Sequence, residues 1–199
     1  GVGGGRWGRA WALATAWGAA EADLPPKTAR APATVDDEGV AGVIPATGHQ
    51  SSIRLGNSIV RLVQNDVIDE SKFQNLYTNR GGLPQDFADV LTAPSDRPIA
   101  LTMQDAVFYV NLLWPLGLSN FMAANDRSPV NGPSVSNFAS TGGWNIGKDA
   151  DGGRYFNKSR IVELTPDQEA TVVRVAESCY RPCCDNSTFF QDCNHGSAL

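Results

Sequence analysis

The sequence has little positive charge, few histidines and no long apolar run. Its 199 residues contain 16 Lys and Arg against 21 Asp and Glu, which gives a net charge of -5. Nucleic-acid-binding proteins normally carry clustered Lys and Arg, so this balance argues against a nucleic-acid partner. No stretch of 18 uncharged apolar residues occurs, so no transmembrane span is predicted. No motif identifies a protein or small-molecule partner.

Cysteine is absent from most of the chain, and all four cysteines fall within the last 21 residues. The segment reads Cys179-Tyr-Arg-Pro-Cys183-Cys184, continues for eight residues and then reads Cys193-Asn-His195. His195 is one of only two histidines in the protein. Because soft, reactive side chains are concentrated nowhere else, we expect the chemistry of the protein to lie here.

The first interpretation of this segment is a transition-metal site. Structural zinc typically takes three cysteines and one histidine, or two of each, all converging on one ion. Adjacent cysteines do not easily bind the same ion, so the candidate ligands are Cys183 or Cys184, together with Cys193 and His195. The C-x2-C pairs of zinc ribbons are missing, so zinc, copper(I) and an iron–sulfur cluster are all compatible with the ligands. We therefore predict a metal-binding Cys/His loop, and no other cofactor-binding residue.

The second interpretation is disulfide bonding. An exported protein matures in an oxidising compartment, where cysteines pair. The adjacent Cys183 and Cys184 would then bond to Cys179 and Cys193. This interpretation predicts a disulfide-stapled binding module without catalysis.

The third interpretation is a thiol-dependent oxidoreductase. A nucleophilic cysteine needs a nearby base or a helix N-terminus that stabilises its thiolate. Cys193 directly precedes a helix predicted to start near His195, and either His195 or His49 is available as a base. The pattern assigns no catalytic residue, and whether the protein is an enzyme stays open.

Residues 1–22 have the features of a secretory signal peptide. Arg6 and Arg9 give a positive start, a short apolar stretch follows, and Ala20-Glu-Ala22 fits the A-x-A cleavage pattern. With this signal the protein is secreted or periplasmic. The alternative is a plain alanine-rich N-terminus, and the protein is then cytoplasmic.

The rest of the chain divides into a linker and a domain. Residues 23–48 are rich in Pro, Ala, Thr and acidic residues without periodicity, which predicts a disordered linker. Residues 49–199 form the predicted domain. The chain stops at Leu199 just after the residues that begin a helix, so we expect this domain to be truncated at its C-terminus.

The predicted fold is mainly α, a single helical domain with a small irregular or β-hairpin insertion. Capping residues and apolar spacing predict four helices. They begin at Ser51 or Ser52, at Asp69, near Thr102 and at Thr165. The Asp-Gly turn of residues 151–152, between aromatic segments, predicts a hairpin or an ordered loop.

Two of these helices carry specific expectations. The third should place Met103 and Val107 on its core-facing stripe and should end or kink at Pro115. The fourth should have a capping box and should place Cys179 on the stripe that faces the core.

The motif also carries a resemblance. The run from Arg181 to Gly196, with its C-C-x8-C-N-H-G pattern, and the run from Asn111 to Gly117 are similar to an uncharacterised prokaryotic protein family. The resemblance extends over residues 45–199 and implies that both runs belong to one domain that continues beyond Leu199. No activity, fold or ligand follows from it.

Overall fold

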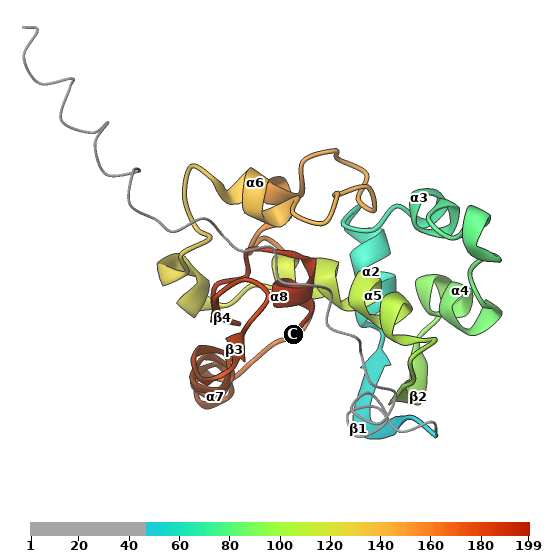
Figure 1. Ribbon diagram of the computed structural model, residues 1–199, viewed down its shortest axis with the longest axis horizontal. Coiled ribbons are helices and arrows are strands. Elements are labelled where there is room, and N and C mark those ends of the chain that lie inside the picture. Colours follow the sequence, from blue (N-terminus) through green and yellow to red (C-terminus); the bar gives the residue numbers. More distant parts are fainter. Residues whose placement is uncertain (1–46) are drawn as a thin grey trace, which may run out of the picture. The chain divides into compact units, whose positions relative to one another are not determined.

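A two-stranded antiparallel sheet begins the part of the chain that the structure, a computed structural model, describes: residues 47–199 (Figure 1). Strand β1 (His49–Gly56) pairs with β2 (Ser95–Leu101), so that His49 lies opposite Leu101 and Gly56 opposite Ser95. The predicted signal peptide lies outside the described residues, as does the predicted linker up to residue 46.

The predicted fold class is wrong. The structure is mixed and mostly helical: among the described residues 46% are helical and 14% are in strands, with seven α-helices and two small antiparallel sheets. Three α-helices separate β1 from β2, so this sheet is not a hairpin insertion. The sequence of β1 contains no local signal of this pairing, because its partner residues lie 39 to 52 positions further along the chain.

Helices α2 (Ser58–Gln64), α3 (Glu70–Asn75) and α4 (Gln85–Thr92) connect the two strands, with a 3-10 turn η1 (Thr78–Arg80) before α4. The first predicted helix exists but begins at Ser58.

Gly56 explains why α2 starts late. Its φ of 55° lies in the left-handed region, which favours glycine. A right-handed helix that began at Ser51 or Ser52 would be interrupted at this residue, so α2 begins only after it. The predicted start of the next helix is confirmed, since the Asp69 side chain accepts a hydrogen bond from the Lys72 backbone N–H at 2.9 Å.

Helix α5 (Ala106–Ser119) continues through Pro115. It buries its aromatic and leucine face, whereas Met103 before it and Val107 within it are 56% and 42% exposed. The predicted core-facing stripe is therefore wrong. The large side chains on the other face bury more apolar area, and that gain decides how the helix is oriented.

The core is one cluster of buried apolar side chains that joins α2, α3, α4 and α5 to the loop after α6. Its largest fully buried apolar members are Tyr77, Phe73, Ile59, Leu62, Ile68, Leu91, Leu112, Leu118, Ile146, Val67 and Val130. None of the described helices is both long and apolar enough to span a bilayer.

The middle of the domain contains short elements: η2 (Ala123–Arg127), α6 (Val135–Ala139) and η3 (Gly152–Tyr155). Of the predicted hairpin or ordered loop around residues 151–152, the structure has the ordered loop. The Trp144 ring packs edge-on against Trp114 with centroids 5.2 Å apart, and this contact anchors the loop on the core.

The C-terminal elements are α7 (Pro166–Ser178), β3 (Tyr180–Arg181), β4 (Asn186–Ser187) and α8 (Asn194–Ala198). The capping box of α7, formed by Thr165 and Gln168, is confirmed. Helix α8 packs on α5 so closely that a Cβ at Gly117 would lie 1.8 Å from the Ser197 carbonyl oxygen. Only glycine at position 117 allows this approach.

Candidate metal and thiol site

The four cysteines come from three connected places in the C-terminal segment. Cys179 caps the end of α7, Cys183 and Cys184 lie in the turn between β3 and β4, and Cys193 caps the start of α8. The pairing of β3 with β4 closes the turn. As a result, one cysteine of the turn reaches the start of α8.

Two of the predicted ligands, Cys184 and Cys193, lie close together. Their Sγ atoms are 3.8 Å apart, and Cys183 Sγ lies 3.5 Å from Cys184 Sγ. Cys184, Cys193 and Asp192 each offer a ligand atom, and these three atoms all lie within 4.8 Å of one another. A metal ion held by sulfur and oxygen donors needs such a convergence.

The other cysteines and His195 lie outside this group of three. Cys183 is exposed beside Cys184, and His195 is exposed on α8. Cys179 is also exposed, so the prediction that it faces the core is wrong. Helix α7 is a surface helix of which only Val173 is buried, and its apolar spacing therefore does not mark a core-facing stripe.

No disulfide is present, since all four cysteines are free. A disulfide requires sulfur atoms about 2.0 Å apart, far less than the 3.5 and 3.8 Å seen here. The bonds that the second interpretation requires are therefore not formed in this structure.

Arg181 lies beneath the cluster and is only 4% exposed. Its guanidinium pairs with the Asp192 carboxylate at 2.7 Å and donates a hydrogen bond to Cys193 Sγ at 3.2 Å. It also donates to the oxygens of Asn186, Ser187 and Phe190. A buried charge is tolerated when it is paired and hydrogen-bonded, so this network fixes the positions of Asp192 and Cys193.

The two close sulfurs differ in their hydrogen-bonding roles. Cys193 Sγ accepts from Arg181 and also from the Gly196 backbone N–H at 3.3 Å. In contrast, the hydrogen bond to Cys183, burial, and the neighbouring Cys193 and Asp192 together raise the pKa of Cys184 to about 12. At neutral pH the Cys184 thiol therefore holds its proton.

Comparison with known proteins gives no assignment. No protein-family model, curated protein or solved structure matches the chain.

Sequence reasoning missed Arg181 and Asp192. The acidic residue beside Cys193 was a usable signal, because a carboxylate next to a cysteine adds a ligand of a type that zinc accepts. The arginine gave no signal, because its burial depends on acceptors from both sides of the turn.

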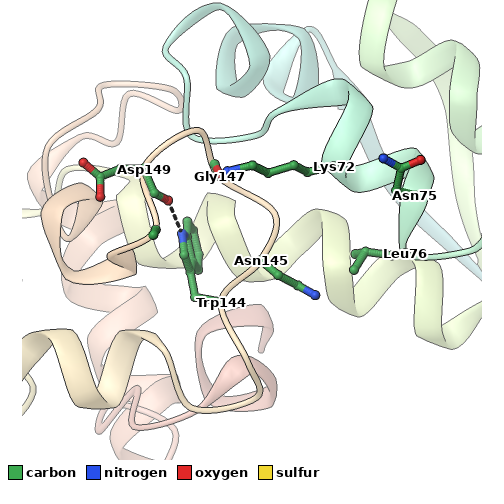
Figure 2. Close-up of a pocket in the computed structure, with 8 residues that line it drawn as sticks. Lys72, Asn75, Leu76, Trp144, Asn145, Gly147 and Asp149 are labelled. Atoms are coloured by element: carbon green, nitrogen blue, oxygen red, sulfur yellow. Dashed lines mark hydrogen bonds between the residues drawn. The ribbon is translucent and has the colours of Figure 1, made fainter.

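A hollow near the loop after α6 is lined by Lys72, Trp144, Gly147 and Asp149, among others (Figure 2). Lys72 Nζ donates to the Gly147 carbonyl at 2.8 Å, and Trp144 Nε1 donates to the Asp149 carbonyl at 3.1 Å. Because these polar groups bond the loop to α3 and to itself, they hold the loop in place. We assign this hollow no ligand.

Proposed function

We propose that the protein binds a zinc-type transition-metal ion through Cys184, Cys193 and Asp192. The observation that carries the proposal is the 3.8 Å separation of the two sulfur atoms. Two thiolates bound to one tetrahedral ion, each with a metal–sulfur bond of about 2.3 Å, lie about 3.8 Å apart. The pair thus already has the spacing that such an ion requires.

The electrostatics of the cluster also suit a cation. Two thiolates and a carboxylate place three negative charges around the ion, whereas Arg181 supplies a single positive charge on the far side of Asp192 and Cys193. Arg181 acts as an outer partner, since its hydrogen bonds orient two of the three ligands. Outer partners of this kind typically contribute tenfold to a hundredfold to metal affinity.

Cys183 and His195 are the two candidates for the fourth ligand. Cys183 Sγ lies 3.5 Å from Cys184 Sγ, and it would complete a tetrahedron if its side chain rotated toward Cys193 and Asp192. His195 follows Cys193 by two residues on α8 and carries an exposed imidazole. We favour Cys183, because its sulfur already touches the cluster.

Cobalt titration of the full chain tests the proposal. Reduced protein purified without chelator should bind one Co2+ with a thiolate-to-cobalt charge-transfer band, and Zn2+ should displace it. Replacing Cys184 or Cys193 by serine should weaken binding by at least tenfold. Replacing Cys183 by serine should weaken it more than replacing His195 by alanine.

Cys179→Ser is the matched control, because Cys179 is a free cysteine of the same segment that lies outside the group of three. This variant should bind cobalt like the unmodified chain. If the reduced protein gives no charge-transfer band, or if Cys179→Ser loses as much affinity as Cys193→Ser, the proposed site is wrong.

A second candidate function is thiol chemistry at Cys193. Two N–H groups, those of Arg181 and Gly196, donate to its sulfur, an arrangement that suits a nucleophilic sulfur. Mass-spectrometric alkylation rates at neutral pH test this function. It is supported if Cys193 reacts fastest in metal-free protein and slows in Arg181→Met, and it is rejected if the exposed Cys179 reacts faster.

A further inference from the structure

Three sulfur atoms meet in the C-terminal segment, and Cys184 is the middle one. Its Sγ lies 3.5 Å from Cys183 Sγ on one side and 3.8 Å from Cys193 Sγ on the other. A disulfide requires sulfur atoms about 2.0 Å apart, so Cys184 has to approach either neighbour by less than about 2 Å to form a covalent bond. The segment is therefore a candidate site of oxidative modification.

The backbone decides which neighbour Cys184 can bond without strain. The peptide bond between Cys183 and Cys184 is trans, and Cα atoms joined in this way lie about 3.8 Å apart. Disulfides usually join Cα atoms about 4.4–6.8 Å apart, so a bond between these two adjacent cysteines is strained. Cys193 is nine positions away in the chain and carries no such restriction. The favoured bond therefore joins Cys184 to Cys193.

The two partners are held differently. Cys193 caps the start of α8, and its sulfur accepts hydrogen bonds from Arg181 and from the Gly196 backbone N–H. Cys184 lies half-buried in the turn between β3 and β4. Among the described residues, the hydrogen-bond partners of its sulfur are the two neighbouring sulfurs. A movement of Cys184 in its turn can therefore close the gap while α8 stays in place.

We propose that Cys184 and Cys193 form a reversible disulfide when the protein meets hydrogen peroxide, and that this bond and the metal ion exclude each other. One sulfur attacks a peroxide oxygen, so that the O–O bond breaks, an S–O bond forms and the thiol proton leaves with the other oxygen as water. The second sulfur then attacks the first, the S–O bond breaks, and the departing hydroxide takes the second thiol proton. Two thiols and one hydrogen peroxide thus give one disulfide and two waters, and the sulfurs lose the two electrons that the peroxide gains.

The exclusion rests on the proposed function, because the disulfide consumes two of the three proposed ligands. A metal ion takes the thiolate form of cysteine. Two sulfurs bonded to each other at about 2.0 Å cannot keep the separation of about 3.8 Å that two ligands of one ion require. Of the group of three, only Asp192 then remains as a ligand. Peroxide would therefore release the ion, and a reductant would restore the site.

Peroxide treatment of the full chain, reduced and free of metal, tests the disulfide. After the remaining thiols are alkylated, cleavage on the N-terminal side of Asp185 and Asp192 separates Cys193 from the other three cysteines. Mass spectrometry should find the peptide that ends at Cys184 joined to the peptide of residues 192–199. A reductant should separate the two peptides.

Serine variants identify the sulfur that bonds to Cys193. Cys184→Ser should lower the yield of the cross-link to less than about one tenth, because the sulfur closest to Cys193 is removed. Cys183→Ser and Cys179→Ser are the matched controls and should cross-link like the unmodified chain. Tryptophan fluorescence checks that all three variants are folded. A cross-link that persists in Cys184→Ser would overturn the proposal, as would a bond between Cys183 and Cys184 or oxidation without any disulfide.

Cobalt binding tests the exclusion separately. The oxidised chain should give no thiolate-to-cobalt band, and a phosphine reductant should restore it. Zn2+ added before peroxide should slow the cross-linking. A reduced chain that binds cobalt but never forms the cross-link keeps the proposed function and refutes the disulfide. A chain that forms the cross-link but never binds cobalt refutes the proposed function and the exclusion, and it supports the disulfide alone.

Discussion

Replacing Arg181 by methionine should destabilise the whole domain. Methionine keeps the apolar stem but removes a guanidinium that donates to five acceptors. The Asp192 carboxylate, whose side chain is 18% exposed, would then lose its only ion-pair partner in the described residues. Breaking a buried pair by removing one member costs about 3–5 kcal/mol, and the partial exposure of Asp192 places the expected loss near the lower end.

Urea unfolding followed by tryptophan fluorescence measures this loss. With a slope of about 2 kcal/mol per molar urea, a loss of about 3 kcal/mol lowers the midpoint by about 1.5 M. Adding Asp192→Asn to Arg181→Met should recover part of the loss, because the unpaired charge is then removed.

Arg154→Met is the control for this measurement. Arg154 pairs with Asp149 at 3.2 Å, but its side chain is 70% exposed, so the pair should contribute less than about 1 kcal/mol. If Arg181→Met shifts the midpoint no more than Arg154→Met, the buried network does not stabilise the fold as argued.

Three further predictions concern the Cys184 thiol and the packing of α8 on α5. Because the pKa of Cys184 is raised to about 12, a metal ion that binds its sulfur must displace a proton. The apparent metal affinity should therefore rise about tenfold per pH unit between roughly pH 6 and 8. A flat profile would exclude Cys184 as a thiolate ligand. The raised pKa of Cys184 also links folding to pH. Its contribution to the free energy of unfolding is complete below pH 9.0, the ordinary pKa of a thiol, and is lost as the pH rises toward 12. Gly117→Ala should lower the free energy of unfolding by about 1–3 kcal/mol, because the new Cβ meets the Ser197 carbonyl. Gly132→Ala is the control and should shift the urea midpoint little, because nothing lies within 4 Å of its Cβ position. Equal shifts in the two variants would contradict the packing of α8 on α5.

Sequence reasoning succeeded where the signal is local. The N-caps at Asp69 and Thr165 were recognisable because the residues that bond to each other lie three positions apart. It failed for β1, where a helix was predicted to begin at Ser51 or Ser52 although Gly56 interrupts it. Strand pairing between residues 39 to 52 positions apart leaves no comparable signal in a single sequence.

The candidate site was partly predictable for the same reason. The cysteine cluster is a feature of composition, so its place was clear from the sequence. Which sulfurs meet depends on how β3 pairs with β4, and this pairing brings Cys184 but not Cys179 to Cys193. The role of Arg181 depends on its burial, which no pattern in the sequence predicts.

The close contact between α8 and α5 has a consequence for how the cysteine segment moves. A helix of five residues does not persist alone in water, so α8 keeps its structure only while it stays seated on α5. The amide protons of α8 should therefore exchange with solvent as slowly as those of the core helix on which it packs. Opening of the thiol cluster and unfolding of the core would then be one cooperative event.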